Sequence, residues 1–106
     1  MKSEFEVRYT DAAREDLLRL HEFLLAHAQT TEDFDEAQDA IGTIVSSVEG
    51  HLSRSPFIFR KADQSPFLRE LIIPCRSHGY VVLYEIDGQA LVTILAVRHQ
   101  LEDDYH

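Results

Sequence analysis

The chain contains little of several residue types that mark particular protein classes. It has one cysteine, Cys75, so no intramolecular disulfide can form and no cysteine-based zinc spacing exists. Only Lys2 and Lys61 are lysines, and 19 acidic residues outnumber 10 basic ones to give a net charge of −9. This excess of acid disfavours broad electrostatic capture of nucleic acid, because such binding needs a basic surface.

Long apolar segments are also lacking. The longest run, residues 90–97, is interrupted by Thr93 and is far shorter than the roughly 20 residues that span a bilayer. Residues 1–10 are polar and charged, without the apolar centre of a signal peptide. We therefore expect a cytoplasmic protein with no membrane partner.

Several motifs of catalysis and metal binding are missing. There is no glycine-rich phosphate loop, no Gly-x-Ser-x-Gly elbow and no His-Glu-x-x-His. The six histidines are scattered, and His21 and His27 fall on different faces of an expected helix. The acidic run at residues 32–39 lacks the central glycine of a calcium loop and fits the start and solvated side of a helix. We expect neither a metal nor a cofactor.

The first half of the chain predicts a strand and two helices. Residues 4–9 alternate between polar and apolar side chains, and Thr10 with Asp11 is typical of a helix start. The apolar face of the first helix is expected to comprise Ala13, Leu17, Leu20, Leu24 and Ala28. A second helix is expected from Thr31, with a core face of Phe34, Ala37, Ile41, Ile44, Val48 and Leu52. The short polar link between them predicts an antiparallel helical hairpin.

The second half predicts strands. A short strand is expected at residues 57–60, followed by three longer ones at 68–73, 80–87 and 91–97. Pro74 should end the first of these three, and Asp87-Gly88 is a strong hairpin signal. The expected fold is one α+β domain over residues 1–106. Its element order is β-α-α-β-β-β, with one further β if the short strand at residues 57–60 is counted, and the helical hairpin packs on one face of an antiparallel sheet.

The charge is distributed unevenly along the chain. Residues 1–53 carry a net charge of −8 and residues 54–106 a net charge of −1. Six of the ten Lys and Arg residues lie between Arg54 and Arg98, so recognition that needs cations is expected in the second half. The candidate target-binding residues are Arg60, Arg69, Tyr84, Arg98 and His99.

Arg69, Arg98 and His99 would form a single site only under a geometric condition. Arg69 starts one expected strand and the other two end another, so a plain meander separates them by roughly 20 Å. A staggered register or a folded-back tail would bring them together. The cluster would then bind an anion or a phosphodiester, with arginine as a charge clamp and histidine as acid or base. The alternative is that His99 caps a strand end while the two arginines pair with nearby glutamates: Glu70, Glu85 or Glu102.

Several segments, in order along nearly the whole chain, resemble the RelE/ParE superfamily of type II toxin–antitoxin toxins, which includes plasmid stabilisation proteins. They are Tyr9-Thr10-x-Ala12-x-x-x-Asp16-Leu17, Pro56-x-x-x-Arg60, Leu68-Arg69-Glu70-Leu71, residues 80–88 and residues 92–100. Each piece alone is weak, whereas their combination is fairly specific. The resemblance implies the same fold, a helical hairpin on an antiparallel sheet.

The resemblance implies one of two activities. RelE-like members are ribosome-dependent mRNA endonucleases that use basic residues with a Tyr or His, whereas ParE-like members poison DNA gyrase. This chain looks closer to ParE, because its acidity and scarcity of lysine suit a protein target. A partial nuclease set supports the RelE-like alternative: Arg69, Arg98, His99 and Tyr105. A third possibility is an inactive toxin-like fold that only binds partners.

The resemblance also implies a cognate antitoxin, with which the toxin would form a hetero-oligomer. A disordered antitoxin segment would fold over an apolar groove between the helical hairpin and the sheet. The candidate lining of that groove is Leu18, Phe23, Leu25, Val45 and Phe57. For each of these residues the alternative is ordinary packing in the core.

Overall fold

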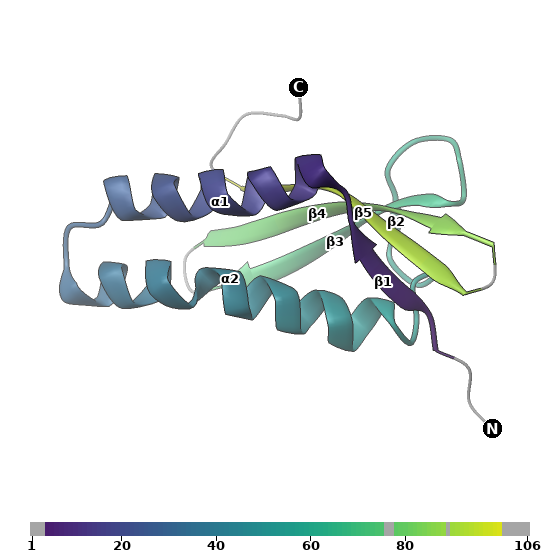
Figure 1. Ribbon diagram of the computed structural model, residues 1–106, viewed down its shortest axis with the longest axis horizontal. Coiled ribbons are helices and arrows are strands. Elements are labelled where there is room, and N and C mark those ends of the chain that lie inside the picture. Colours follow the sequence, from purple (N-terminus) through teal and green to yellow (C-terminus); the bar gives the residue numbers. More distant parts are fainter. Residues whose placement is uncertain (1–3, 76–77, 89, 101–106) are drawn as a thin grey trace.

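Two helices and five strands follow one another in the predicted order. The computed structural model describes residues 4–75, 78–88 and 90–100. The elements are β1 (Glu6–Tyr9), α1 (Asp11–Ala26), α2 (Thr31–Leu52), β2 (Arg60–Lys61), β3 (Leu68–Cys75), β4 (His78–Asp87) and β5 (Leu91–His99). The helices lie side by side across one face of the sheet, so the predicted α+β class and helical hairpin are confirmed (Figure 1).

The helix starts follow local signals in the sequence. Thr10 is the N-cap of α1, and its hydroxyl accepts a hydrogen bond of 3.0 Å from the Ala13 N–H. Thr30 caps α2 in the same way by accepting from the Asp33 N–H, and the Asp33 carboxylate in turn accepts a hydrogen bond from the Thr30 N–H. Both caps satisfy N–H groups that the first turn of a helix leaves unpaired.

No helix in the described part of the chain is long and apolar enough to cross a membrane.

The sheet is mixed, with the strand order β1-β5-β4-β3-β2. Strands β2 to β5 pair antiparallel as predicted, whereas β1 pairs parallel with β5. The two helices carry the chain from β1 at one edge of the sheet to β2 at the other. The antiparallel strands β2 to β5 then lead back across the sheet, so that β5 lies beside β1 and runs parallel to it. Parallel pairing of this kind requires a long crossover connection.

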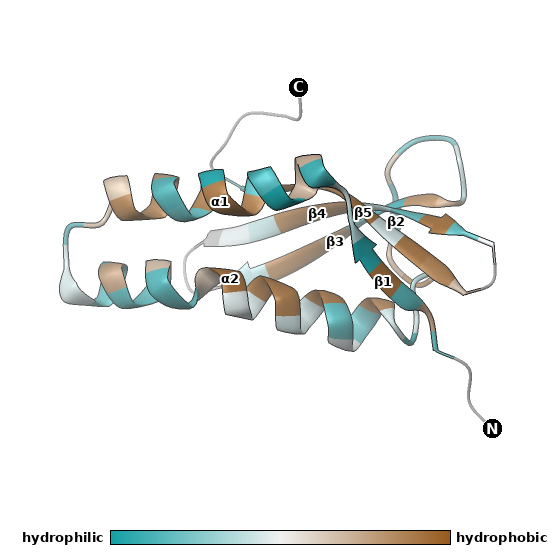
Figure 2. Cartoon of the chain, viewed as in Figure 1, coloured by the Kyte–Doolittle hydropathy of each residue, from teal (hydrophilic) through white to brown (hydrophobic). Residues whose placement is uncertain are grey.

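The core lies between the hairpin and the sheet. Strands β3 to β5 are largely apolar, and the helices mix apolar with polar residues (Figure 2). The buried residues of α2 are Ala37, Ala40, Ile44, Val48 and Leu52. The prediction that Phe34 belongs to this face is wrong, because its side chain is 48% exposed. Phe34 lies in the first turn of α2, about 60° around the helix from Ala37.

Several predicted element boundaries are also wrong, including the end of the first helix, because α1 stops at Ala26 and leaves Ala28 outside it. β3 continues through Pro74, which pairs with Gly79, instead of ending before it. β2 pairs only with Arg69 and Glu70, so the later part of β3 is an edge, where proline is tolerated. The short strand expected at residues 57–60 is confined to Arg60 and Lys61.

The start of α1 covers the part of β5 that β1 leaves unpaired. The β1–β5 ladder ends at Ile94, whose carbonyl accepts hydrogen bonds from the Thr10 backbone N–H (3.0 Å) and hydroxyl (3.1 Å). Further along, the Val97 N–H donates to the Asp16 carboxylate over 3.0 Å. These contacts satisfy edge groups of β5 and attach α1 to the sheet. They give a structural reason for Thr10 and Asp16 in the first of the sequence motifs.

Candidate functional site

The predicted target-binding residues fall into two groups at opposite ends of the sheet. On β4, Arg69 pairs with Tyr84, whereas His99 pairs with Tyr80. These two partners are four residues apart, which is roughly 13 Å along the strand. The expected separation of Arg69 from His99 is therefore confirmed. We call the two regions the Arg69 end, with Arg69 and Tyr84, and the His99 end, with His99 and Tyr80.

Arg98 lies on the other face of the sheet from His99. It pairs with Val81, one position before the Val82–Val97 pair in the ladder. Since successive side chains of a strand point to opposite faces, His99 faces the helices and Arg98 the open face, away from them. The structure does not bring Arg69, Arg98 and His99 together.

Arg69 is bound to the loops that flank β2. Its Nη1 donates to the carbonyls of Phe57 (2.8 Å) and Phe59 (2.7 Å), and its Nε donates to that of Pro66 (2.7 Å). The guanidinium carbon also lies 5.5 Å from the centre of the Phe57 ring. Arg69 thus holds two loop segments against the sheet.

Tyr84 is fully buried beside Arg69. Its hydroxyl donates a hydrogen bond of 2.6 Å to the Pro56 carbonyl. Burial raises the pKa of Tyr84 to about 12, and the positive charge of Arg69 opposes this shift. Tyr84 is therefore neutral at physiological pH and holds the same loop as Arg69.

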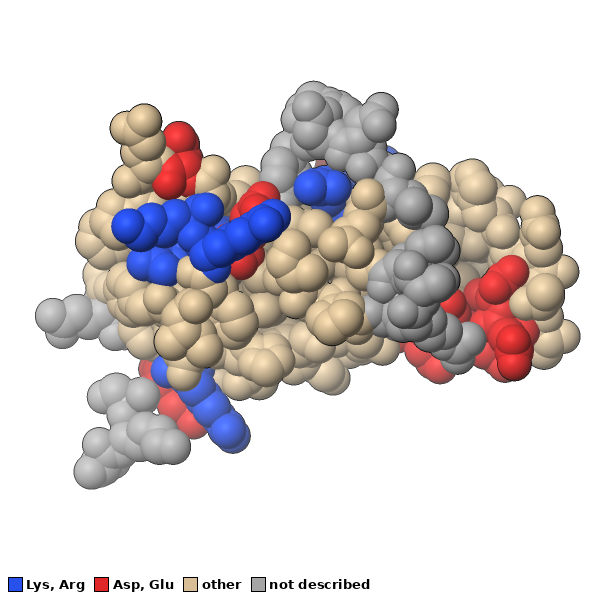
Figure 3. Space-filling model, turned by 180° about the vertical axis from the view of Figure 1, so that it is seen from behind, with Lys and Arg blue, Asp and Glu red and all other residues tan. Residues whose placement is uncertain are grey.

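Arg60 extends from β2 on the open face. It forms an ion pair with Glu70, its partner across β2 and β3, over 2.6 Å. The alternative in which Arg69 pairs with a nearby glutamate is wrong for Glu70, because adjacent residues of β3 point to opposite faces and the Arg69 donors bind backbone carbonyls. Lys and Arg side chains gather over this end of the sheet, and acidic ones gather at the far end, where the helices join (Figure 3).

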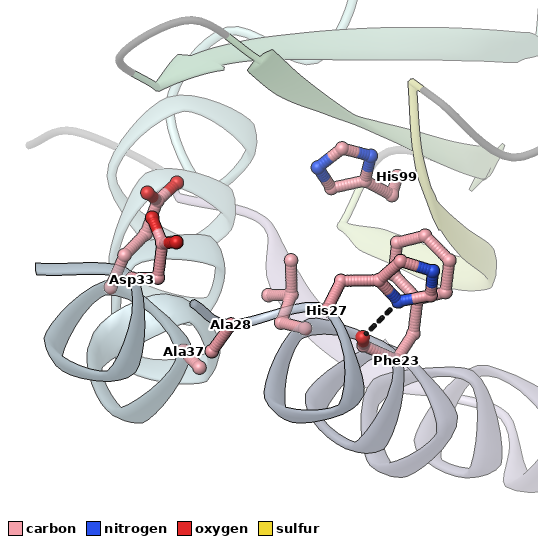
Figure 4. A pocket seen from close by; sticks show the side chains of 8 residues that line it. Phe23, His27, Ala28, Asp33, Ala37 and His99 are labelled. Carbon is pink, nitrogen blue, oxygen red and sulfur yellow. Dashed lines mark hydrogen bonds between the residues drawn. The ribbon is translucent and has the colours of Figure 1, made fainter. Parts of the chain in front are cut away.

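His99 lies in a small pocket between the helices and the end of β5. The pocket measures about 160 Å³ and is lined by Phe23, Leu24, His27, Ala28, Asp33, Glu36, Ala37 and His99. The His99 ring is 1% exposed and lies 5.6 Å from the Phe23 ring. His27 packs on Phe23 at 4.3 Å, and its Nδ1 is 2.9 Å from the Phe23 carbonyl. Figure 4 shows both imidazoles beside the Phe23 ring and Asp33 across the pocket.

The carboxylates around this pocket set its electrostatic character. Asp33 and Glu36 both line it, together with His27 and His99. Asp33 also accepts the backbone N–H groups of Gln29 (3.0 Å) and Thr30 (3.3 Å) as part of the α2 cap. The two carboxylates oppose the entry of an anion such as phosphate into this pocket. Within the described ranges, no group of three or more His, Cys, Asp or Glu side chains is placed to hold a metal ion.

The predicted antitoxin-binding residues are at least partly accessible. Leu18 is 68% exposed, Phe57 44% and Val45 39%, and both Phe23 and Leu25 are half-buried. Full burial in the core is therefore excluded for Leu18, Val45 and Phe57, whereas Phe23 and Leu25 are partly packed against other residues. The five residues do not line one groove, because Phe23 lies at the His99 end and Phe57 at the Arg69 end. Tyr105 lies outside the described residues.

Sequence reasoning missed a pair of similar turns at the Arg69 end. Ser55-Pro56-Phe57 and Ser65-Pro66-Phe67 repeat at a spacing of ten residues. Their aromatic side chains meet edge to face, with ring centres 6.2 Å apart. The repeated Ser-Pro-Phe was the available signal, because proline in the second position favours a tight turn.

Comparison with known proteins finds similarity to a family profile, to a named toxin and to solved structures. The profile of the family described as ParE toxin of type II toxin-antitoxin system, parDE, matches residues 7–104. Toxin RelE3 of Caulobacter vibrioides (strain ATCC 19089 / CIP 103742 / CB 15) is 36% identical over 90 residues, covering 85% of this chain and 88% of that protein. The solved structure described as "Chromosomal ParDE TA system from P. aeruginosa" is similar with a TM-score of 0.66 at 16% identity. That alignment covers 88% of this chain and 92% of the other and concerns the fold alone.

Proposed function

This chain belongs to the ParE toxin family of type II toxin–antitoxin systems, and we propose that it acts by binding DNA gyrase. In this proposal the toxin inhibits a protein target without cutting a substrate itself. A cognate antitoxin neutralises it by forming a hetero-oligomer in the cytoplasm.

The separation of the predicted nuclease residues is the observation that carries this proposal. Cleavage of a phosphodiester needs a cation and an acid or base within hydrogen-bond reach of the same phosphate. Arg69 and His99 pair with residues four positions apart on β4, and Arg98 lies on the opposite face from both. Moreover, the Arg69 guanidinium already donates to three backbone carbonyls.

The electrostatics of the His99 end support the same proposal. His99 is buried, and the pocket that it lines also contains Asp33 and Glu36. An RNA backbone that approached this pocket would meet two carboxylates on a chain of net charge −9. A protein target carries no such uniform negative charge.

The alternative is a ribosome-dependent mRNA endonuclease. One observation favours it, namely the 36% identity to a protein named Toxin RelE3. In this alternative Arg98 would contact the phosphate, and His99 or Tyr105 would move the proton of the ribose hydroxyl. Arg69 would then have only a structural role, in holding the loops that flank β2.

Two assays with the purified toxin separate these functions. We expect the toxin to inhibit DNA supercoiling by gyrase and to leave mRNA intact on programmed ribosomes. Codon-linked cuts that disappear in His99→Ala, and persist in the matched control His21→Ala, would overturn the gyrase proposal. If neither assay responds and expression harms no bacterial host, the chain is a binding module without toxin activity.

A further inference from the structure

We infer that the twin Ser-Pro-Phe turns form a docking surface for an acidic segment of a partner protein that carries apolar anchors. We call this surface, made of Phe57, Ile58 and Phe67 with the surrounding cations, the twin-turn surface. The inference rests on the proposed function, because the partner would be the protein target of the toxin.

The two turns have the same local geometry. In the first, the Ile58 N–H donates to the Ser55 carbonyl, and in the second the Leu68 N–H donates to the Ser65 carbonyl, both over 3.4 Å. Each proline occupies the second position of its turn, where its fixed φ favours the bend. Each turn therefore places a phenylalanine at its third position.

Contacts from the sheet hold both turns before any partner binds. The Pro56 carbonyl accepts from the Tyr84 hydroxyl, and the Pro66 carbonyl accepts from Arg69. In addition, the Ile86 N–H donates to the Phe67 carbonyl over 2.8 Å. Because the backbone of both turns is already ordered, the toxin would lose little conformational entropy when a partner binds at this surface.

The side chains that the turns present are apolar and exposed. Ile58 is 74% exposed, Phe67 48% and Phe57 44%. Phe57 contacts the Phe67 ring and also lies 6.4 Å from the Phe5 ring, so the aromatic residues form a continuous cluster. Exposed apolar clusters of this kind are typical of protein interfaces, where buried aromatic anchors supply most of the binding energy.

The charge around this cluster differs from that of the rest of the chain. Residues 54–69 contain four Lys and Arg residues and a single acid, Asp63, whereas the whole chain has a net charge of −9. Arg54, Arg60 and Lys61 are exposed, and Arg60 shares its charge with Glu70. Electrostatic complementarity therefore favours an acidic partner, which the remaining surface of the toxin would repel.

The packing of the rings favours protein over nucleic acid. Single-stranded nucleic acid binds by stacking bases on open aromatic faces. Here the Arg69 guanidinium lies over the Phe57 ring, and Phe5 and Phe67 approach that ring at 68° and 74°. This packing occupies one face of the Phe57 ring, which favours a partner that inserts side chains around the rings over one that stacks bases upon them.

The experiment measures binding of three labelled probes to the full-length toxin by fluorescence anisotropy. The probes are a peptide that alternates Glu with Leu and Phe, the same peptide with Lys in place of Glu, and a thymidine oligonucleotide. We expect only the acidic peptide to bind, with affinity that falls as salt rises. Tighter binding of the basic peptide or of the oligonucleotide would overturn the inference.

Matched variants locate the binding. Phe67→Asp and Lys61→Glu should each lower the affinity for the acidic peptide at least tenfold, whereas Phe34→Asp and Arg14→Glu should leave it unchanged. Phe34 and Phe67 are equally exposed, at 48%, so the first pair differs in position and not in burial. Equal losses in the control variants would overturn the inference. So would a dimer of the toxin that Phe67→Asp abolishes, because the surface would then serve a second copy.

A supercoiling assay separates this inference from the proposed function. Phe67→Asp should inhibit gyrase at least tenfold less than wild type, while Phe34→Asp should inhibit it fully. If Phe67→Asp inhibits as strongly as wild type, the twin-turn surface is overturned and the gyrase proposal stands. If wild type does not inhibit gyrase but the peptide results hold, the gyrase proposal alone fails.

Discussion

The Arg69 end and the His99 end of the sheet use their polar residues in different ways. At the Arg69 end, the guanidinium and the Tyr84 hydroxyl bind backbone carbonyls and so build the loops that carry the exposed Phe57 and Phe67. At the His99 end, the imidazole is buried in a pocket that contains two acidic residues. One end therefore presents an apolar and cationic surface, whereas the other presents an acidic pocket.

This difference teaches that a cation in the sequence is not always a cation available to a ligand. Arg60 and Arg69 are nine residues apart and belong to paired strands. Arg60 is exposed at the surface, while Arg69 is engaged by three carbonyls. Whether an arginine can bind a target depends on where its donors are directed, which is a property of the folded chain.

The largest expected effect is on the stability of the Arg69 end. Arg69→Ala removes three hydrogen bonds from a charged donor, so we expect the free energy of unfolding to fall by about 3 kcal/mol. Urea denaturation measures this change. Arg54→Ala is the control, because Arg54 is exposed and its replacement should change the free energy of unfolding by less than about 0.5 kcal/mol. A stable Arg69→Ala protein that no longer inhibits gyrase would instead make Arg69 a target contact.

The corresponding change near the His99 end is Asp16→Ala. It leaves the Val97 N–H without its acceptor, two residues before His99, and should destabilise the protein by about 2 kcal/mol. Asp16→Asn retains an oxygen acceptor and should recover most of the loss. Thermal or urea unfolding measures both variants. If the two were equally unstable, the charge of Asp16 and not its hydrogen bond would be responsible.

A smaller effect is expected on antitoxin binding at the helical hairpin. Leu18 is 68% exposed, so Leu18→Asp should leave the free energy of unfolding nearly unchanged. It should weaken antitoxin binding at least tenfold, or about 1.4 kcal/mol, by placing a charge in an apolar interface. Isothermal titration calorimetry measures the affinity. The other outcomes are informative: unchanged affinity excludes Leu18 from the interface, and loss of folding returns it to a structural role.

The smallest expected effect concerns alkaline pH. Burial raises the pKa of Tyr84 to about 12, and burial with the Glu49 carboxylate raises that of Tyr9 to about 12. Because both folded-state values exceed the ordinary value of 10, the stabilisation is present below pH 10 and is lost as the pH rises towards 12. Tyr84→Phe should cost about 1 kcal/mol at neutral pH and reduce this alkaline loss. If Tyr84→Phe and wild type lost the same stability at alkaline pH, ionisation of Tyr84 would not contribute to that loss.

Much of the fold could be predicted from the sequence because its signals are local. Thr10 and Thr30 cap helices through residues three positions away, and Gly88 turns the β4–β5 hairpin with a φ of 68°. The order of helices and strands follows from such caps, turns and apolar spacings. The candidate site was less predictable. The sequence identified Arg69, Arg98 and His99 as candidates, but the structure does not bring them together into one site.

By itself, the sequence determined the helical hairpin and the three-strand meander. These features depend on caps, turns and the length of a strand, which act over a few residues. Only the tertiary structure decided that β1 runs parallel to β5 and that Asp16 binds a backbone group 81 residues away. It also decided that Tyr84 reaches Pro56 and that the buried His99 shares a pocket with two carboxylates. The reason is physical: hydrogen-bond partners and burial depend on which distant segments pack together, and packing is a property of the whole chain.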